Sequence, residues 1–135
     1  MSQENVEIVR RAFDGAGTGL RKAAETYWHP EVEYVEDPRW PGASTYRGRD
    51  AVVRCFESYM EALGREEDIV VTVERVLDAG ARQVPFVRVR GYAATSGVPH
   101  DHLWGYVVEV RERRIIYFRA YHDPADALEA VGLSE

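Results

Sequence analysis

The first half of the chain places hydrophobic residues at helical spacing. Val6, Val9 and Phe13 recur every three to four positions, which predicts a first helix that ends in the glycines of residues 15–19. Residues 20–27 are predicted to form a short second helix, because Pro30 disfavours helix at the residue before it. Asp50 is predicted to cap a third helix whose apolar side consists of Ala51, Val52, Cys55, Phe56, Tyr59, Met60 and Leu63.

Most of the remaining chain alternates between apolar and polar residues, which is typical of strands. Strands are predicted at residues 32–35, 69–77, 84–94, 102–110 and 115–122, and Asp123 or Asp126 is placed to cap a short final helix. Helices followed by an antiparallel meander define the α+β class. Because long sheets twist, we expect a cone-shaped, curved, mostly antiparallel sheet wrapped around three N-terminal helices.

Length, charge and cysteine content narrow the class of protein. The 135 residues fit one domain, residues 1–135, and 45% hydrophobic content can fill one core. The net charge of -6 without a basic stripe argues against nucleic acid as a partner. Cys55 is the single cysteine, which excludes an internal disulfide and a cysteine-based zinc site. No apolar run approaches membrane-spanning length, so we expect a cytoplasmic protein with no membrane partner.

Three stretches in this order carry a resemblance to a known family. They read YWHPEVEYVEDP, YRGRDAVVRCFE and RRIIYFRAYHDPADALEAVG, and they are spread over nearly the whole chain. Together they resemble the nuclear transport factor 2-like (NTF2-like) superfamily and its SnoaL-like domains. The resemblance implies a cystatin-like α+β barrel that is often dimeric through its sheet. It does not fix a function, since one fold hosts many functions.

The resemblance to ketosteroid isomerases of this superfamily implies two candidate catalytic aspartates. Residues 35–38 read VEDP and resemble the tag that carries the general base, which implies Asp37 in that role. Residues 100–103 read HDHL and resemble the phrase of a protonated acid that donates to the oxyanion, which implies Asp101. The stretch after Asp101 is about four residues longer than the family's spacing, and Phe13 stands where a tyrosine hydroxyl is expected.

SnoaL-type cyclases and limonene-type epoxide hydrolases place a catalytic acid on the last strand. Ala120 stands at that position, and Asp123 matches the strand-end aspartate instead, which argues against both mechanisms. His122 is then the remaining polar group expected on the concave side of that strand. It is interpreted either as an acid or base or as a core histidine bonded to a hydroxyl.

Each candidate has a structural alternative. Asp37 is either a base in a partly dry pocket or a turn former before Pro38, and Glu36 is then expected on the opposite, solvated side. Alternation puts Asp101 on one face and His100 with His102 on the other, so only one set can line a pocket. A metal site of His100, His102 and His122 is conceivable, but no metal and no cofactor are expected.

A hollow beneath Phe13 is predicted, lined by Phe13, Trp28, Trp40, Tyr59, Phe118 and Ala120. The leading hypothesis is cofactor-independent, isomerase-like proton transfer on a small apolar carbonyl compound, with catalytic residues Asp37, Asp101 and His122. The alternative is a non-catalytic ligand-binding or dimerisation domain. A homodimer through an open sheet face bearing Trp104 and Tyr106 is also expected.

Overall fold

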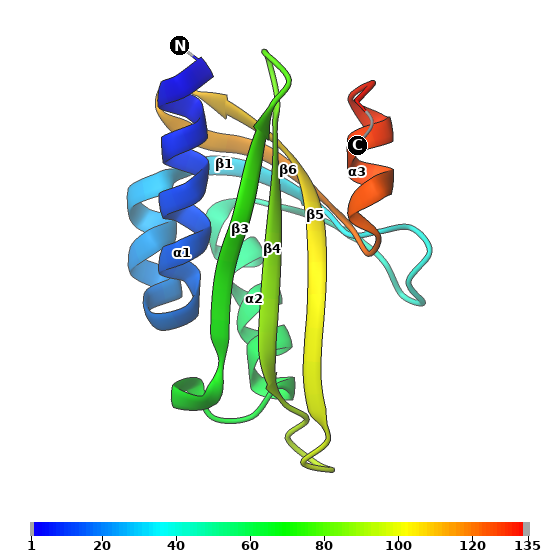
Figure 1. The fold of residues 1–135 in the computed structure, drawn as a ribbon. Helices are drawn as coiled ribbons and strands as arrows, with labels where there is room; N and C mark the ends of the chain where they lie inside the picture. The colour runs from blue at the N-terminus through cyan, green and yellow to red at the C-terminus, as the bar shows by residue number, and fades with distance from the viewer. Residues whose placement is uncertain (1, 134–135) are drawn as a thin grey trace.

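The protein consists of one curved sheet with helices on both of its faces (Figure 1). The computed structural model describes residues 2–133, and the side chains of residues 2, 15–18 and 66 are outside this description. The elements in chain order are α1 (Ser2–Tyr27), β1 (Trp28–Val35), β2 (Thr45–Arg47), α2 (Arg49–Ala62), the 3-10 helix η1 (Glu66–Asp68), β3 (Val70–Asp78), β4 (Gln83–Tyr92), β5 (Pro99–Arg111), β6 (Arg114–Tyr121) and α3 (Pro124–Ala130).

The sheet has the strand order β2-β1-β6-β5-β4-β3. Strands β3 to β6 form an antiparallel meander, while β1 returns parallel to β6 with Tyr34 opposite Phe118 and Val35 opposite Arg119. Because the pairing is parallel, the ends of β1 and β6 lie at the same edge of the sheet. The predicted α+β class and the mostly antiparallel curved sheet are confirmed.

Some element boundaries differ from the prediction. The two expected N-terminal helices form one element, α1, with a non-helical residue at Gly19. β1 begins before Pro30, because the β1–β6 register is irregular between Trp28 and Glu33 and tolerates a residue without an N–H. Gly48, and not Asp50, occupies the N-cap of α2, with a φ of 89° and no side-chain bond. The three-residue β2 is too short to show a pattern in the sequence.

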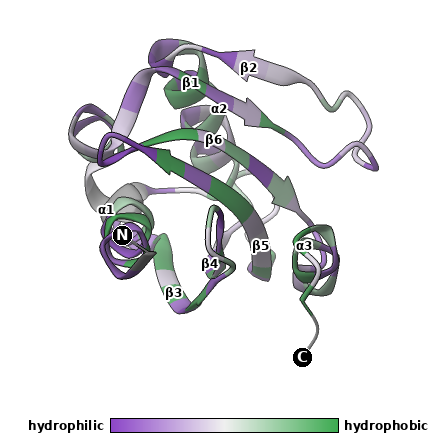
Figure 2. Cartoon of the chain, turned by 90° about the horizontal axis from the view of Figure 1, so that it is seen from above, coloured by the Kyte–Doolittle hydropathy of each residue, from purple (hydrophilic) through white to green (hydrophobic). Residues whose placement is uncertain are grey.

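The sheet buries a different cluster on each face. Helices α1 and α2 pack on the concave face around Phe118, and the view from above shows them enclosed by the curve of the sheet (Figure 2). Helix α3 packs on the convex face of β4 and β5 through Ala127 and Leu128. Gly105 permits this packing, since a Cβ there would lie 2.7 Å from Pro124 Cα. The concave face is therefore where a deep pocket can form.

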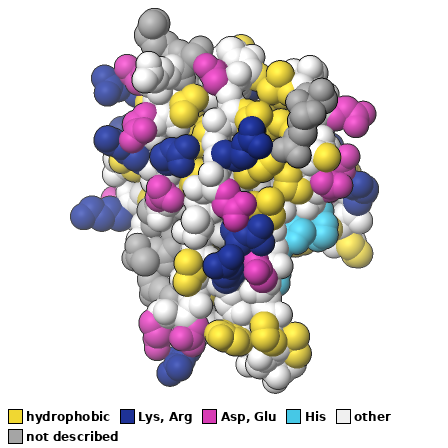
Figure 3. Space-filling view, in the orientation of Figure 1, with side chains coloured by type: hydrophobic (Ala, Val, Ile, Leu, Met, Phe, Trp, Pro, Cys, Tyr) yellow, Lys and Arg dark blue, Asp and Glu magenta, His cyan; other side chains and the backbone are white. Residues whose placement is uncertain are grey.

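Acidic and basic side chains alternate on the convex face over β3 to β5 (Figure 3). Arg88 on β4 pairs with Asp101 at 2.9 Å, and Arg90 lies 3.5 Å from the same carboxylate. Trp104 and Tyr106 are 5% and 4% exposed and belong to the concave cluster, so the expectation that they lie on an open sheet face is wrong. The homodimer itself stays a prediction.

Among residues 2–133, no helix has both the length and the apolar character required to cross a membrane.

Candidate functional site

A pocket of about 630 Å³ opens between α2 and the concave face of the sheet. One side of α2 supplies residues at helical spacing. The end of β1, the short β2 and the middle of β5 supply the opposite wall, because their inward side chains share the face that α2 covers. The loop after β1 adds Trp40. The lining residues are Tyr34, Glu36, Trp40, Tyr46, Ala51, Arg54, Cys55, Phe56, Ser58, Tyr59, Trp104 and Tyr106.

Aromatic rings form most of the pocket wall. Trp40 packs edge-on against Trp104 with ring centroids 5.0 Å apart, and Tyr34 packs against Phe56 at 4.8 Å. Trp40 is 37% exposed, which places it at the rim of the pocket. Such a wall suits a compact, largely apolar molecule held by a few polar groups.

The expected hollow beneath Phe13 is almost filled. A small cavity of about 30 Å³ lies there, bordered by Phe13 and Trp28. The ring of Phe13 packs against Tyr106 at 4.9 Å and against Phe118 at 6.1 Å. The open space is displaced from this position toward the end of β1 and the middle of β5, where smaller and polar side chains of α2 face the sheet.

Glu36 is the carboxylate that lines the pocket. Val32 and Tyr34 are buried on the concave side, and Glu36 continues the same alternation one step beyond the end of β1. Its Oε1 accepts the backbone N–H of Ser44 at 3.0 Å, and its Oε2 lies 3.8 Å from Cys55 Sγ. Burial first and then the Glu36 charge raise the pKa of the Cys55 thiol to about 11. The expected solvated position of Glu36 is therefore wrong.

Tyr34 and Tyr106 direct two hydroxyl groups into the pocket. Both side chains are nine-tenths buried, at 6% and 4% exposed, and neither hydroxyl has a hydrogen-bond partner among the described residues. Both oxygens nevertheless keep accessible surface, so they face the open space of the pocket. Burial is the main cause that raises both pKa values, which keeps both groups protonated as donors.

Tyr59 lies at the centre of a short hydrogen-bonded chain. Trp104 Nε1–H donates to the Tyr59 hydroxyl at 3.0 Å, and the same hydroxyl lies 3.2 Å from His100 Nε2. Burial raises the pKa of Tyr59 to about 12, against a smaller lowering by the Trp104 bond. The chain leads from the pocket wall to a partly exposed histidine on β5.

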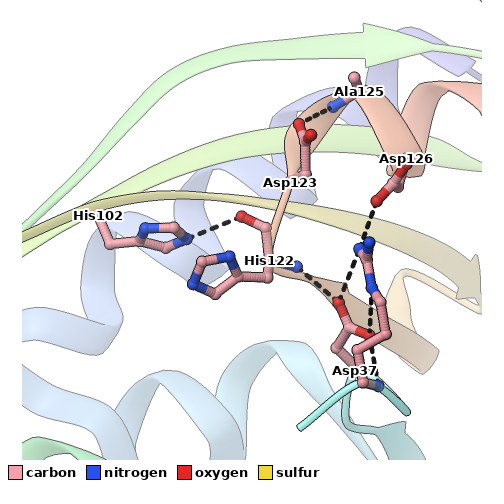
Figure 4. Close-up of polar contacts among 7 residues, drawn as sticks. Asp37, His102, His122, Asp123, Ala125 and Asp126 are labelled. Carbon is pink, nitrogen blue, oxygen red and sulfur yellow. Dashed lines mark hydrogen bonds and ion pairs between the residues drawn. The ribbon is translucent and has the colours of Figure 1, made fainter.

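Asp37 lies beside the pocket but does not line it. Its carboxylate is 2% exposed and accepts the backbone N–H groups of His122 at 2.9 Å and Arg39 at 3.0 Å (Figure 4). The guanidinium of Arg39 bridges Asp37 to Asp126 on α3. Burial alone raises the pKa of Asp37, but the bonds from His122 and Arg39 together lower it below its ordinary value. These are the bonds of the turn-forming alternative.

Asp101 lies on the convex face, across the sheet from the pocket. Its carboxylate bonds to Arg88 Nη1 at 2.9 Å, and this bond is the first cause of its lowered pKa. A protonated acid that donates inside the pocket is the opposite of this arrangement. The alternation of Asp101 against His100 and His102 holds, and the histidines are the set on the concave side.

His122 lies on the surface, and its ring packs at a tilt against that of His102 with ring centroids 4.0 Å apart. Histidine side chains form a visible patch on the surface in Figure 3. His102 Nε2–H donates to the backbone carbonyl of His122 at 2.8 Å, and burial is the main cause that lowers the His102 pKa. His100 is bonded to Tyr59 instead. Within residues 2–133, no group of three or more His, Cys, Asp or Glu side chains could hold a metal ion.

The six expected lining residues fall into three groups. Trp40 and Tyr59 line the pocket, Phe13 and Trp28 border the small inner cavity, and Phe118 and Ala120 are buried without bordering either space. The ring of Phe118 is stacked on Phe56 at 5.8 Å, in the middle of the core.

Several residues that line the pocket were not predicted to do so, including Glu36, Tyr46 and Cys55. A signal for Glu36 was present, because the buried positions 32 and 34 of β1 share its parity. A signal for Cys55 was also present, since it lies on the apolar side of α2 together with Tyr59. Tyr46 had no such signal, because β2 was not predicted.

The whole fold resembles that of solved proteins. An NTF2-like protein from Burkholderia xenovorans has a TM-score of 0.69, 21% identity and coverage of 98% of both chains. A protein from Catenulispora acidiphila with a ketosteroid isomerase-like fold, solved with trimethylamine, has a TM-score of 0.69, 21% identity and coverage of 94% of this chain and 93% of the other. A Jannaschia protein classed with the SnoaL-like polyketide cyclases has a TM-score of 0.74, 19% identity and coverage of 99% and 95%.

No protein-family profile matches the sequence, and no curated protein matches it at a significant level. The identities to the solved structures are too low to transfer an activity, and proteins of this architecture have many functions. The agreement over nearly the full length is an agreement of fold. This chain therefore has the NTF2-like fold, which it shares with SnoaL-like and ketosteroid isomerase-like proteins.

Proposed function

We propose that this protein binds a compact, largely apolar organic molecule that carries a hydrogen-bond acceptor such as a carbonyl group. The observation that carries the proposal is the pair of buried hydroxyls of Tyr34 and Tyr106, which have no partner among the described residues and lie in an aromatic pocket of about 630 Å³. Buried polar groups ordinarily have a partner, and one that faces a pocket is satisfied by water or by a ligand. Two phenol donors favour an acceptor on that ligand.

The binding test uses a matched pair of probes, 2-acetylnaphthalene and naphthalene, titrated into the protein and followed by NMR shifts. The ketone is expected to bind more tightly than the hydrocarbon. Tyr34→Phe and Tyr106→Phe should each lower the affinity for the ketone by about fivefold, which is the effect of one hydrogen bond, and leave the affinity for naphthalene unchanged. Tyr117→Phe is the matched control, since Tyr117 lies outside the pocket. Equal affinities of the two probes in the wild type would contradict the proposal that the ligand carries a hydrogen-bond acceptor.

An organic ammonium ion is the competing ligand class. Aromatic walls with one carboxylate also suit a cation, and the Catenulispora protein was solved with trimethylamine. Tetramethylammonium is therefore the third probe. If it binds and the ketone does not, the pocket is a cation site and the proposal is wrong. The guanidinium of Arg54 in the pocket lining argues against a cation and supports the neutral carbonyl compound.

The second candidate is proton transfer on the bound carbonyl compound, and the position of Glu36 in the pocket favours it. The Glu36 carboxylate would take a proton from the carbon next to the carbonyl, the C–H electron pair would form the enolate double bond, and the negative charge would move to oxygen. Phenol donors would stabilise that oxygen. This retains the isomerase-like chemistry of the sequence hypothesis but assigns the base to Glu36, because Asp37 is fully bonded and its pKa is lowered.

Deuterium exchange tests this candidate. The methyl protons of 2-acetylnaphthalene are followed by NMR in D₂O with the wild type, Glu36→Gln and Asp37→Asn. We expect exchange above the buffer rate, a loss of about 100-fold with Glu36→Gln, and a rate close to the wild type with whatever fraction of Asp37→Asn remains folded. Exchange that is insensitive to Glu36→Gln, or that stays at the buffer rate, rules out proton transfer but leaves the binding proposal intact.

A further inference from the structure

We propose that His100 controls whether Tyr59 presents a hydrogen-bond donor or an acceptor to the pocket, and that it thereby makes the preferred ligand depend on pH. The inference rests on the proposed ligand pocket and concerns a residue that does not itself line it. Its basis is the chain of two hydrogen bonds from Trp104 through Tyr59 to His100.

The number of donors and acceptors on each side chain determines which hydrogen bonds Tyr59 can make. The indole N–H of Trp104 only donates, so it occupies one of the two acceptor sites on the Tyr59 oxygen. One acceptor site and one O–H remain, and they are shared between His100 and the pocket. If His100 bonds to the O–H, the acceptor site is left for a ligand. If His100 bonds to the acceptor site, the O–H is left for a ligand.

A neutral His100 with a free Nε2 lone pair accepts the Tyr59 O–H. This direction is favoured because a phenol is the stronger acid and an imidazole nitrogen the stronger base. Tyr59 then offers its remaining lone pair to the pocket, as an acceptor. A protonated His100 carries hydrogen on both nitrogens and must donate to Tyr59. Both acceptor sites are then occupied, and the O–H turns to the pocket as a donor.

His100 is placed to respond to the proton concentration in solution. It is partly exposed at the open end of β5, where a proton can reach its ring. From α2 the titratable group that faces it is Tyr59, and from its own strand His102 interacts with it electrostatically. On β4 its partner is Gly91, and Arg90 and Asp101 point to the other face. Among the described residues, no carboxylate forms a salt bridge with its ring, and the hydrogen bond of the ring is the one to Tyr59.

The other groups in the chain do not compete for this role. Burial raises the pKa of Tyr59 to about 12, so its hydroxyl stays protonated in the range where histidine ordinarily titrates. Trp104 does not titrate. His102, whose pKa is lowered mainly by burial, donates to the carbonyl of His122 and has no bond to Tyr59. His102 is therefore the matched control.

The first test uses the protein without ligand. The ¹⁵N signal of the Trp104 indole N–H is followed from pH 5 to pH 8.5 together with the ring signals of His100. Because Tyr59 changes from donor to double acceptor, the indole signal should shift with the midpoint of His100. Tyr59→Phe should abolish this shift and His102→Leu should keep it. A Trp104 signal that ignores the His100 titration overturns the proposal whether or not any ligand binds.

The second test uses the probes of the preceding section. Affinity for 2-acetylnaphthalene relative to naphthalene should rise about fivefold as His100 becomes protonated, since the ketone then gains one donor. His100→Leu should remove the pH dependence, and His102→Leu should retain it. Dependence that persists in His100→Leu assigns the effect to another group and overturns the proposal. A normal indole titration with no binding of either probe would instead count against the proposed function alone.

Discussion

Glu36 and Asp37 are adjacent in the sequence, but their carboxylates have opposite surroundings. Glu36 continues the inward alternation of β1 and reaches the aromatic pocket, where Cys55 and Tyr46 are its neighbours. Asp37 turns the other way and joins the ends of β1 and β6 to α3 through His122 and Arg39. The Glu36 carboxylate can still accept a hydrogen bond from a ligand, whereas the Asp37 carboxylate is hydrogen-bonded within the protein.

The difference follows from where β1 ends. Within the strand each step reverses the side of the sheet, so Glu36 shares the side of Tyr34. At Asp37 the chain leaves the strand, and its Oδ1 closes a local turn on the N–H of Arg39. Because β6 runs parallel to β1 and ends beside it, the N–H of His122 is within reach of Oδ2. Asp37 is therefore expected to contribute to stability and Glu36 to ligand binding, and substitutions at each acid test this.

The largest expected effect is the loss of stability in Asp37→Ala. The substitution leaves the N–H groups of His122 and Arg39 without their charged acceptor, which should lower the free energy of unfolding by about 3 kcal/mol. The solvent-exposed guanidinium of Arg39 adds little to this figure. Urea unfolding at pH 7 measures the change.

Asp101→Ala is the matched control, since it removes an exposed aspartate from surface ion pairs and should change stability far less than Asp37→Ala. Glu36→Gln should also stay well below the effect of Asp37→Ala. A loss in Glu36→Gln as large as that in Asp37→Ala would break the division between the two acids.

A smaller loss of stability is expected when the pH is lowered. The folded pKa of Asp37 is lowered, so its contribution to stability is fully present above the unfolded carboxyl pKa of about 3.9 and is lost as pH falls through the lower folded value. Wild-type stability should therefore decline below about pH 4, and Asp37→Asn should decline less over the same range. Unfolding midpoints at pH 7, 4 and 3 measure the two slopes. Parallel slopes would remove Asp37 as a source of acid sensitivity.

Much of the fold could be predicted, because it follows from patterns that act over short distances. The helical spacing around Phe13, the alternation of the long strands and the capping chemistry of Asp123 all appear in the structure. The three-residue β2 could not be predicted, since it is too short to show an alternation and is defined only by its pairing with β1 across the loop of residues 36–44. The start of β1 before Pro30 likewise depends on an irregular register with β6.

The site was less predictable, because it depends on how a strand ends. The tag at residues 35–38 suggested Asp37 as the inward acid, and alternation counted from Asp37 then placed Glu36 outside. Counting from the buried Val32 and Tyr34 gives the opposite answer, which the structure has. The position of Asp101 followed the same rule once β5 was regular, with Trp104 on the inner side.

A further effect, severalfold in rate, is expected at Cys55. Burial and then the Glu36 charge raise its thiol pKa to about 11, so little thiolate is present at pH 8. Glu36→Gln removes the charge, lowers the pKa and should speed alkylation by iodoacetamide severalfold. Asp37→Asn keeps Glu36 and should leave the rate of the folded protein unchanged. Because Cys55 is the single cysteine, mass spectrometry of the whole chain gives the rate directly. Equal acceleration by both substitutions would indicate general loosening and not a local charge.

The smallest expected effect has the opposite sign to that of Asp37→Ala. The Tyr106 hydroxyl is buried without a partner in the described part of the chain, so Tyr106→Phe removes a polar group that makes no bond to the described residues of the protein. Its stability should be unchanged or higher by up to about 1 kcal/mol. Tyr59→Phe is the contrast, because it breaks the bonds to Trp104 and His100 and should lower stability by about 1 kcal/mol. Urea unfolding of both variants without ligand compares them. A loss in Tyr106→Phe equal to that in Tyr59→Phe would mean that the Tyr106 hydroxyl has a structural partner, and the pocket would then have one donor fewer for a ligand.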